Sequence, residues 1–301
     1  MRDNRIDNIK GILIFLVVLG HMLEFCNAGS NGLMLQLIIY TFHMPAFFFF
    51  MGMVSKPNPK GVAKNIIIYL LFQVIYYVFI VNVTKEDADL SIVEPYWILW
   101  FTMVSVYYGI LLIIIDKYHI NINYLFAISI IASLLIGYAS NVGYKYAISR
   151  FFTFLPYLLA GIIYKDSKWR YRRSIGIVFL TVILILIPIF YGYYNIHILF
   201  GAYSYIDANY NPLIKGSLYI VAFVYILFLY MYVPNKELPI FNKIGKNTLL
   251  IYLLHGFFIR LFRKYNFFTY SENVNLILSI MIAFFLVIIL GNIRIPKQKE
   301  T

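Results

Sequence analysis

Long apolar runs separated by short polar segments dominate the chain. A helix that crosses a bilayer needs about 20 mostly apolar residues, and ten runs approach this length. We expect spans at residues 10–27, 33–54, 63–83, 95–115, 121–140, 148–164, 173–194, 213–233, 247–264 and 273–292. The sixth and ninth runs are short or end in charges, which leaves nine or eleven spans as alternatives. The pattern predicts an all-α polytopic integral membrane protein, with residues 1–301 forming a single transmembrane domain.

Lysine and arginine are unevenly distributed over the polar segments. With the N-terminus inside, 18 of the 25 fall on the cytoplasmic side and 7 on the outer side, among them Arg150 and Lys215. This asymmetry follows the positive-inside rule. We therefore expect both termini in the cytoplasm. The aromatic-rich segment NIHILFGAYSYIDANYN, residues 195–211, is expected outside, as a belt at the membrane interface.

Composition supports the membrane interpretation. Hydrophobic residues make up 62% of the chain and charged residues 13%, against roughly 25% charged residues in soluble domains. The formal charge of +12 is explained by membrane orientation, so no nucleic-acid partner is expected. Cys26 is the only cysteine, which excludes an intrachain disulfide and a cysteine metal cluster. We expect no metal and no cleavable signal peptide.

Four ionisable side chains lie well inside the expected spans: His21, Glu24, His43 and His255. Such groups are costly at membrane depth and usually mark a cavity or a reaction path. With a rise of about 1.5 Å per residue, His21 lies roughly 16 Å from Lys10 at the inner rim, His43 at a similar level, and His255 roughly 12 Å deep. Three histidines from three helices at nearly one depth predict a buried site.

One stripe of the first span carries three of these polar groups. Lys10 and His21 are eleven residues apart, which places them about 20° apart on one helical face. Glu24 follows His21 by three residues and is its neighbour on the same side. A carboxylate beside a histidine fixes its tautomer and raises its basicity. The stripe therefore predicts a general base.

Structural interpretations compete with these assignments. A single intramembrane histidine often serves as a hydrogen-bonding residue between helices, and we favour this interpretation for His43 but not for the His21–Glu24 pair. Lys10, Lys60 and Lys64 also fit cationic anchors whose heads reach the inner interface.

Several segments resemble the membrane-bound acyltransferase-3 family. Its signature is an Arg or Lys, ten intervening residues and a His, a spacing that Lys10 and His21 meet. The likeness continues in FHMPAFFFFMG (42–52), at Lys60 and Lys64 before IIIYLLF, and in YWILWFT (96–102), RFFTFLPYLLAG (150–161) and IGKNTLLIYLLH (244–255). The chain is most similar to the exopolysaccharide and fucose O-acetylase branch. It departs from the family in Met51, where Ser is common, and in having Lys60 and Lys64 where Arg is common.

The resemblance implies acetyl transfer from cytoplasmic acetyl-CoA to a hydroxyl of a cell-surface polysaccharide or its lipid-linked precursor. Lys10, Lys60 and Lys64 would then attract the phosphates of the donor at the cytoplasmic mouth. His21 would act as a general base or accept the acyl group itself, and Glu24 would orient it.

Three further roles follow from the same resemblance. His255 is the stronger candidate and His43 the weaker one for a polar contact that steadies the thioester oxyanion. Arg150 matches a family position, which assigns it to acceptor contact or to bracing the cavity. The expected partners are the glycan, membrane lipid and the polysaccharide synthesis machinery.

Two functions of other classes remain open. A flippase or transporter of acyl groups or lipid-linked sugar would have paired broken helices, but Pro45, Pro156 and Pro188 do not form such pairs. A non-catalytic partner of a polysaccharide synthase would need no His21–Glu24 pair. The residue composition indicates an AT-rich genome and hence a bacterial inner membrane. The sugar, the hydroxyl and the side of transfer are not encoded in any recognisable pattern.

Overall fold

The computed structural model describes residues 3–166 and 195–293, and it divides the chain into two compact units. The first comprises Met1–Leu33 with Val233–Thr301, and the second Met34–Tyr232. The described residues form helices and connecting segments without strands, which confirms the all-α prediction. Seven of these helices are long and apolar enough to cross a membrane. The expected span 173–194 lies outside the described residues.

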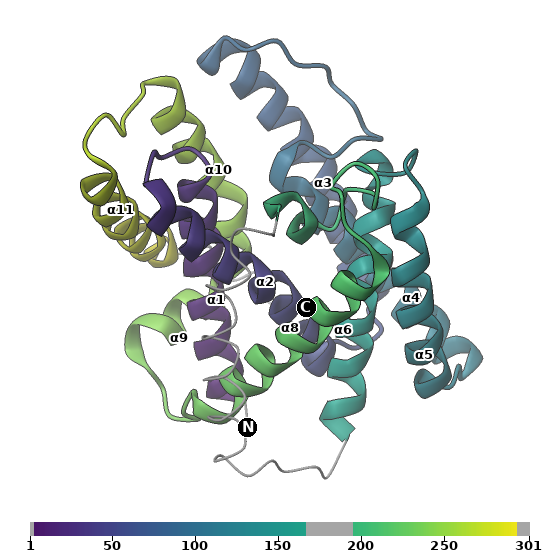
Figure 1. Cartoon of the computed structure of the whole chain (residues 1–301). Coiled ribbons are helices and arrows are strands. Elements are labelled where there is room, and N and C mark those ends of the chain that lie inside the picture. Colours follow the sequence, from purple (N-terminus) through teal and green to yellow (C-terminus); the bar gives the residue numbers. More distant parts are fainter. Residues whose placement is uncertain (1–2, 167–194, 294–301) are drawn as a thin grey trace. The chain divides into compact units, whose positions relative to one another are not determined.

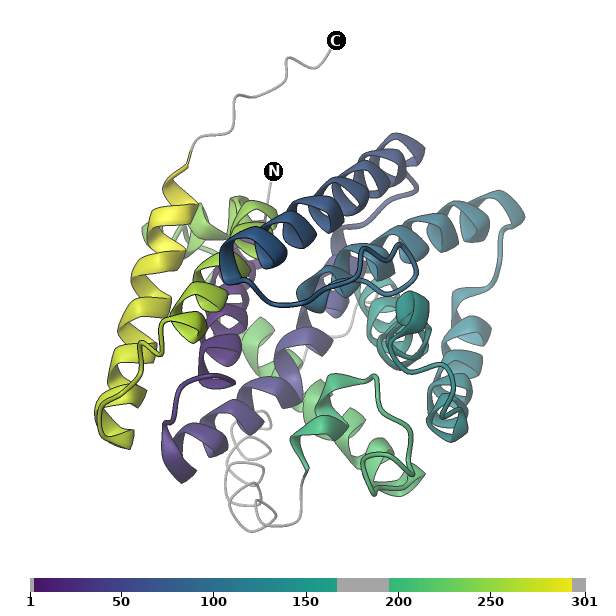
Figure 2. The same ribbon diagram turned by 90° about the horizontal axis from the view of Figure 1, so that it is seen from above.

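The first unit contains α1 (Asn4–Leu23), α9 (Pro239–Lys246), α10 (Thr248–Lys264) and α11 (Glu272–Asn292). Figures 1 and 2 both show α1, α10 and α11 side by side, with α9 against the first half of α1. The expected spans 247–264 and 273–292 match α10 and α11 to within one residue. The sequence prediction missed α9, which is too short to register as a span.

The limits of α1 differ from the expected span 10–27. The helix begins six residues earlier because Asp3 caps it, its carboxylate accepting a hydrogen bond from the Arg5 backbone N–H at 2.9 Å. It ends four residues earlier, with Glu24 as the capping residue. His21 therefore lies in the last turn, about 26 Å along the axis from the helix start. The expected placement of His21 and Glu24 deep inside the helix is wrong.

The second unit contains most of α2 (Gly29–Val54), then α3 (Pro59–Phe79), α4 (Trp100–Tyr118), α5 (Ile122–Leu135), α6 (Ile148–Asp166) and α8 (Pro212–Tyr232). Two glycines allow α2 and α6 to touch along their backbones. A Cβ on Gly52 would lie 2.1 Å from the Leu158 carbonyl oxygen, and one on Gly161 would lie 2.0 Å from that of Phe49. Such small-residue contacts are typical of helix pairs in membranes.

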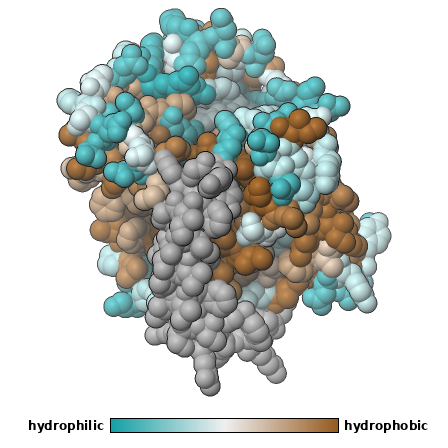
Figure 3. All heavy atoms as spheres, viewed as in Figure 1, coloured by the Kyte–Doolittle hydropathy of each residue, from teal (hydrophilic) through white to brown (hydrophobic). Residues whose placement is uncertain are grey.

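Aromatic rings fill the centre of the second unit. Phe48 is fully buried and contacts Tyr108 edge-on at 5.2 Å between centroids, while its ring stacks on Phe154 at 5.2 Å. Trp100 also stacks on Phe154, at 5.5 Å. Elsewhere apolar side chains are exposed, as on α3, where Ile67 is 64% exposed. Figure 3 shows hydrophobic residues reaching the surface, as expected for helices solvated by lipid.

The segment 195–211 folds onto α5 and α6. It begins with the short helix η6 (Ile196–Phe200), and Tyr205 and Tyr210 are buried. The Tyr205 hydroxyl donates to the Leu134 carbonyl at 2.6 Å, and the Tyr210 hydroxyl donates to that of Tyr203 at 3.1 Å. Burial raises the pKa of Tyr210 to about 12, which keeps the phenol a donor at neutral pH. The expected interfacial belt is thus wrong for these two rings, which form part of a packed cluster.

Candidate active site

His21, Glu24 and His255 lie together in the first unit. His21 Nδ1 is 3.1 Å from Glu24 Oε1, and both side chains are largely buried. The His255 ring stacks on that of His21, with centroids 5.6 Å apart and an angle of 23° between the planes. His255 lies near the middle of α10 and is fully buried. The geometry brings together the three residues expected to be catalytic.

The bond to Glu24 selects one tautomer of His21. An ionised carboxylate only accepts hydrogen bonds, so Nδ1 carries the hydrogen and donates it to Oε1. In the neutral ring, Nε2 is then the basic nitrogen. A proton taken up at Nε2 would be stabilised by the neighbouring carboxylate. The pair therefore has the arrangement of an oriented general base.

The hydrogen bond of His255 fixes its tautomer as well. Its Nδ1–H donates to the Ile251 carbonyl at 3.1 Å, one turn earlier in α10. The neutral ring then presents Nε2 as an acceptor and not as an N–H donor. A neutral His255 therefore fits an acceptor of a hydroxyl hydrogen better than the expected donor to an oxyanion.

Lys10 has a partner that the sequence argument overlooked. Its ammonium is 3.6 Å from Asp7 Oδ1, three residues earlier on α1. The Lys10 side chain is 27% exposed, whereas that of Asp7 is 5% exposed. Asp7 lies in the helix only because α1 starts at Asn4. The sequence signal that could have predicted this ion pair is the i, i+3 spacing of Asp7 and Lys10.

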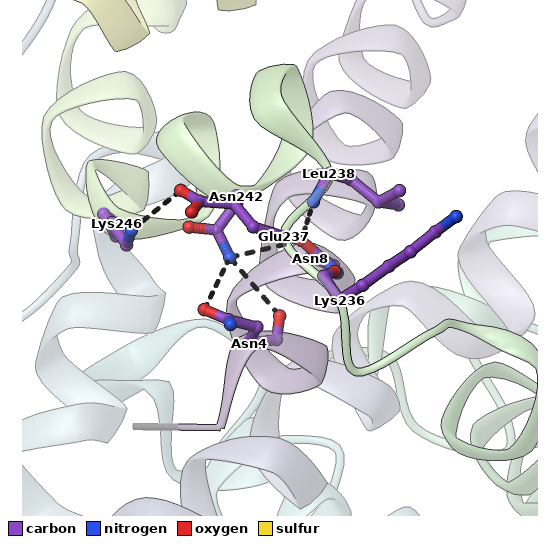
Figure 4. A network of polar contacts seen from close by, with 7 residues as sticks. All are labelled: Asn4, Asn8, Lys236, Glu237, Leu238, Asn242 and Lys246. Carbon is purple, nitrogen blue, oxygen red and sulfur yellow. Dashed lines mark hydrogen bonds and ion pairs between the residues drawn. The ribbon is translucent and has the colours of Figure 1, made fainter. Parts of the chain in front are cut away.

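A clamp of amide side chains joins α1 to the segment that carries α9 (Figure 4). Asn8 Nδ2 donates to the Pro234 carbonyl at 3.0 Å and to that of Lys236 at 2.8 Å. Its Oδ1 accepts from the Leu238 backbone N–H at 3.3 Å and from Asn242 Nδ2 at 3.2 Å. Asn8 and Asn242 are both fully buried. We call these two residues the amide clamp.

Two glycines complete the contact between α1 and α9. A Cβ on Gly245 would lie 1.8 Å from the Asp7 carbonyl oxygen, and one on Gly11 would lie 2.0 Å from that of Phe241. The polar end of α9 adds Lys246, 3.4 Å from Glu237. The turn of α1 that bears Lys10 is therefore fixed against α9, and both carry lysines at the same end of the unit.

The remaining predicted residues belong to the second unit. Lys60 and Lys64 are exposed on the first turns of α3. His43 is buried in α2, and its Nδ1–H donates to the Ile39 carbonyl at 2.8 Å. That bond lies within its own helix, whereas the interpretation favoured for His43 expected a hydrogen bond between helices.

Arg150 is 6% exposed and closely packed. Its Nε donates to the Phe200 carbonyl at 3.1 Å. Its guanidinium lies over the rings of Trp100, at 4.6 Å, and Tyr144, at 4.8 Å. Two roles were expected for Arg150, acceptor contact and bracing of the cavity. These contacts fit the bracing role.

The fold and the paired histidines define a class: a multi-pass helical membrane protein with a largely buried histidine–carboxylate pair beside a second histidine. The model of the acyltransferase-3 family, described as an acyltransferase domain, matches residues 3–292. The chain therefore belongs to this family of acyltransferases. The family assignment from the Lys10–His21 spacing is confirmed.

One curated relative is the nodulation protein NolL of Mesorhizobium japonicum. It is 30% identical over 127 residues, which cover 35% of this chain and 34% of the relative. The matched part of the chain thus spans about a third of the length of that protein. No solved structure matches the chain.

Proposed function

We propose that this protein is a membrane O-acetyltransferase that moves an acetyl group from cytoplasmic acetyl-CoA to a hydroxyl of a cell-surface polysaccharide or its lipid-linked precursor. The observation that carries the proposal is the His21–Glu24 contact of 3.1 Å, with the ring of His255 stacked on His21. Membership of an acyltransferase family supports the reaction class.

In the proposed step, Nε2 of His21 removes the proton of the acceptor hydroxyl as its oxygen attacks the thioester carbonyl carbon. The C–O bond forms, the C–S bond breaks, and CoA leaves as a thiolate. The imidazolium then returns its proton to the thiolate. Glu24 holds Nδ1–H throughout, so that His21 begins and ends neutral.

His255 has a supporting part in this proposal. Its Nε2, an acceptor in the neutral ring, suits a hydrogen bond from the acceptor hydroxyl or from a neighbouring hydroxyl of the same sugar. Such a bond would orient the nucleophile towards the thioester.

The donor phosphates are assigned to the cytoplasmic lysines. Lys10 is the principal candidate, since it lies on the helix that carries His21, and Asp7 limits its motion. Lys60 and Lys64, which are exposed on α3, are the further candidates. Lysine ammonium groups attract phosphate as point charges without the planar fork of arginine.

The test is acetyl transfer by the purified protein in lipid nanodiscs. Radiolabelled acetyl-CoA is incubated with a panel of glycans, and the free CoA thiol and labelled glycan are measured together. Equal amounts of both products, formed only with an acceptor, support the proposal. A protein that is folded and inserted but releases no thiol with any glycan contradicts it.

The transporter alternative gains no support from the described helices, and Pro188 lies outside the described residues. Pro45 lies inside α2 and Pro156 inside α6, and each helix continues past its proline. Broken helices at matching positions are the signature expected of that class.

A further inference from the structure

Lys215 is a buried cation that the proposed reaction does not use. It lies in the first turns of α8 and is 6% exposed. Its Nζ donates to Thr153 Oγ1 at 3.2 Å and lies 5.9 Å from the ring centroid of Tyr205. α6, α8 and the segment 195–211 therefore converge on one ammonium group.

The surroundings of this ammonium are held in place by several contacts. The Tyr219 hydroxyl donates to the Thr153 carbonyl at 2.7 Å, which ties α8 to α6. Ser149 Oγ donates to the Gly201 carbonyl at 3.0 Å, which ties segment 195–211 to α6. The site is therefore fixed before any ligand arrives, which reduces the entropic cost of binding.

The charge of Lys215 is poorly balanced within the protein. An ammonium has three donors, and among the residues that the structure describes only Thr153 accepts from it. None of the ion pairs between described residues includes Lys215. Buried charges in proteins are normally paired, and a ring face 5.9 Å away compensates only in part. With its amine protonated, Lys215 gives the site a positive charge that an anion would balance.

The position of Lys215 is also unusual for the expected topology. It is one of the seven cations on the outer side, where the positive-inside rule disfavours lysine. A topological anchor would place its head in the aqueous interface, whereas this side chain is almost wholly buried. The anchor explanation therefore does not account for it.

Rings with exposed surface lie beside this site. Tyr144 is 42% exposed and meets Tyr203 edge-on at 5.7 Å, and the His197 ring lies 4.7 Å from that of Tyr203. Tyr203 is joined to the Lys215 environment because its carbonyl accepts from Tyr210, whose ring packs on Tyr205. Amphipathic rings of this kind suit a partner that has both apolar C–H faces and hydroxyls.

We infer that Lys215 and Thr153 bind an oxyanion, either carboxylate or phosphate, on the acceptor glycan, with the partly exposed rings of Tyr144 and Tyr203 against its sugar ring. The inference rests on the proposed function, because it names the class of acceptor as an acidic glycan. Lys215 is then a residue that determines acceptor specificity. Arg150, one turn away from Thr153 on α6, lies over the ring of Tyr144 and helps to position it.

The test compares disaccharides that differ only in charge. The dissociation constants of cellobiose, cellobiouronic acid and cellobiose phosphate are measured by calorimetry with the full-length protein in nanodiscs, without acetyl-CoA. We expect the wild type to bind at least one acidic form at least tenfold more tightly than cellobiose. The acidic form that binds more tightly distinguishes carboxylate from phosphate.

Three variants locate the effect. Lys215→Met should abolish the preference for the acidic form, Lys215→Arg should keep most of it, and Lys145→Met, a matched change at an exposed outer lysine, should leave it unchanged. Lys215→Met should also raise the thermal midpoint, because a buried charge is removed. If Lys215→Met does not fold, the test rests on the wild-type preference for the acidic form and on whether Lys215→Arg keeps that preference.

Two results of the binding experiment would overturn the inference: a wild type that binds the charged and neutral disaccharides alike, or an equal loss of preference in Lys145→Met and Lys215→Met. Binding is measured without the donor, so it can succeed even where acetyl transfer fails. Conversely, transfer to neutral and acidic glycans at the same rate would preserve the proposed function and remove this inference.

Discussion

The two units are built from similar apolar helices but are held together by different chemistry. Buried polar side chains fix the first unit, with the amide clamp of Asn8 and Asn242 at α9 and Asn275 bonded to the Asn27 carbonyl at 3.0 Å. Stacked rings around Phe48 and Trp100 fix the second. Buried hydrogen bonds impose direction and register, whereas ring packing mainly fills volume. The second unit also contains buried hydrogen bonds, such as that from Ser149 Oγ to the Gly201 carbonyl, but the His21–Glu24 pair lies in the unit whose α1 is held by the amide clamp.

The histidines show the same difference at the scale of one residue. His21 is oriented by a carboxylate from the end of its helix, and His43 by a carbonyl of its own helix. Only the first arrangement places a carboxylate beside the ring. The residue type is the same, so we expect the partner of Nδ1 to decide which histidine acts as a base.

The largest expected effect comes from removing the imidazole of His21, compared with removing that of His43. His21→Ala should lower the rate of acetyl transfer by about 10²- to 10⁴-fold, the usual contribution of a positioned general base. His43→Ala should leave most activity, because its hydrogen bond stabilises only its own helix. Initial rates of acceptor-dependent thiol release, at equal amounts of inserted protein, provide the measurement.

Glu24→Gln sharpens the same comparison. It keeps the size of the side chain but removes the charge that favours the imidazolium, so the rate should fall by less than in His21→Ala. A His43→Ala variant as inactive as His21→Ala would show that the partner of Nδ1 is not what distinguishes the two rings.

The second effect concerns close contacts between a glycine and a backbone carbonyl, which occur within each of the two units. Gly245→Ala in the first unit and Gly161→Ala in the second should each lower stability by about 1–3 kcal/mol or more, because the added methyl meets a backbone oxygen. Gly216→Ala is the control, since its methyl meets no described atom within 4 Å. It should be neutral or slightly stabilising. Thermal midpoints in one detergent measure all three variants.

Only Gly245→Ala is also expected to reduce activity at a temperature where the protein stays folded, since it displaces α9 from the helix that carries His21 and Lys10. Equal activity in Gly245→Ala and Gly161→Ala would show that the position of α9 has no influence on the site.

Much of the architecture could be predicted from the sequence, because lipid requires long apolar helices whose limits are visible as polar residues. Each expected span that falls on described residues coincides with a helix. The largest difference in the limits is at α1, where the cap at Asp3 extends the helix through a polar turn that hydropathy alone excludes. α9 was missed because eight residues with two lysines form no apolar run.

The candidate site was predictable where its members lie close in sequence. His21 and Glu24 are three residues apart, so helical geometry alone brings them together. That His255 would stack on His21 depends on how α1 and α10 pack, which one sequence does not reveal. The buried state of Lys215 likewise depends on the fold of segment 195–211, which resembled a simple interfacial belt.

A third, smaller effect tests the directional bonds of the first unit. Asn242→Leu should lower stability by about 1–3 kcal/mol, because Asn8 Oδ1 loses a buried donor. Tyr108→Phe, which removes the hydroxyl that donates to the Phe151 carbonyl at 2.8 Å in the second unit, should cost about 0.5–1.5 kcal/mol, since the ring packing stays. Thermal midpoints again provide the measurement, and a larger loss in Tyr108→Phe would reverse the contrast between the units.

The smallest expected effect separates the lysines of the two units. Lys10→Ala should raise the KM for acetyl-CoA about two- to fivefold with kcat nearly unchanged, because a partly exposed charge contributes about 0.2–1 kcal/mol. Lys60→Ala, at an exposed position on α3, should raise it less, since no neighbouring carboxylate is seen to fix that side chain as Asp7 fixes Lys10. The difference should shrink at high salt, where exposed charges are screened. A larger rise in Lys60→Ala than in Lys10→Ala would instead assign the donor phosphates mainly to the second unit, and would confine the role of the first unit to the His21–Glu24 pair.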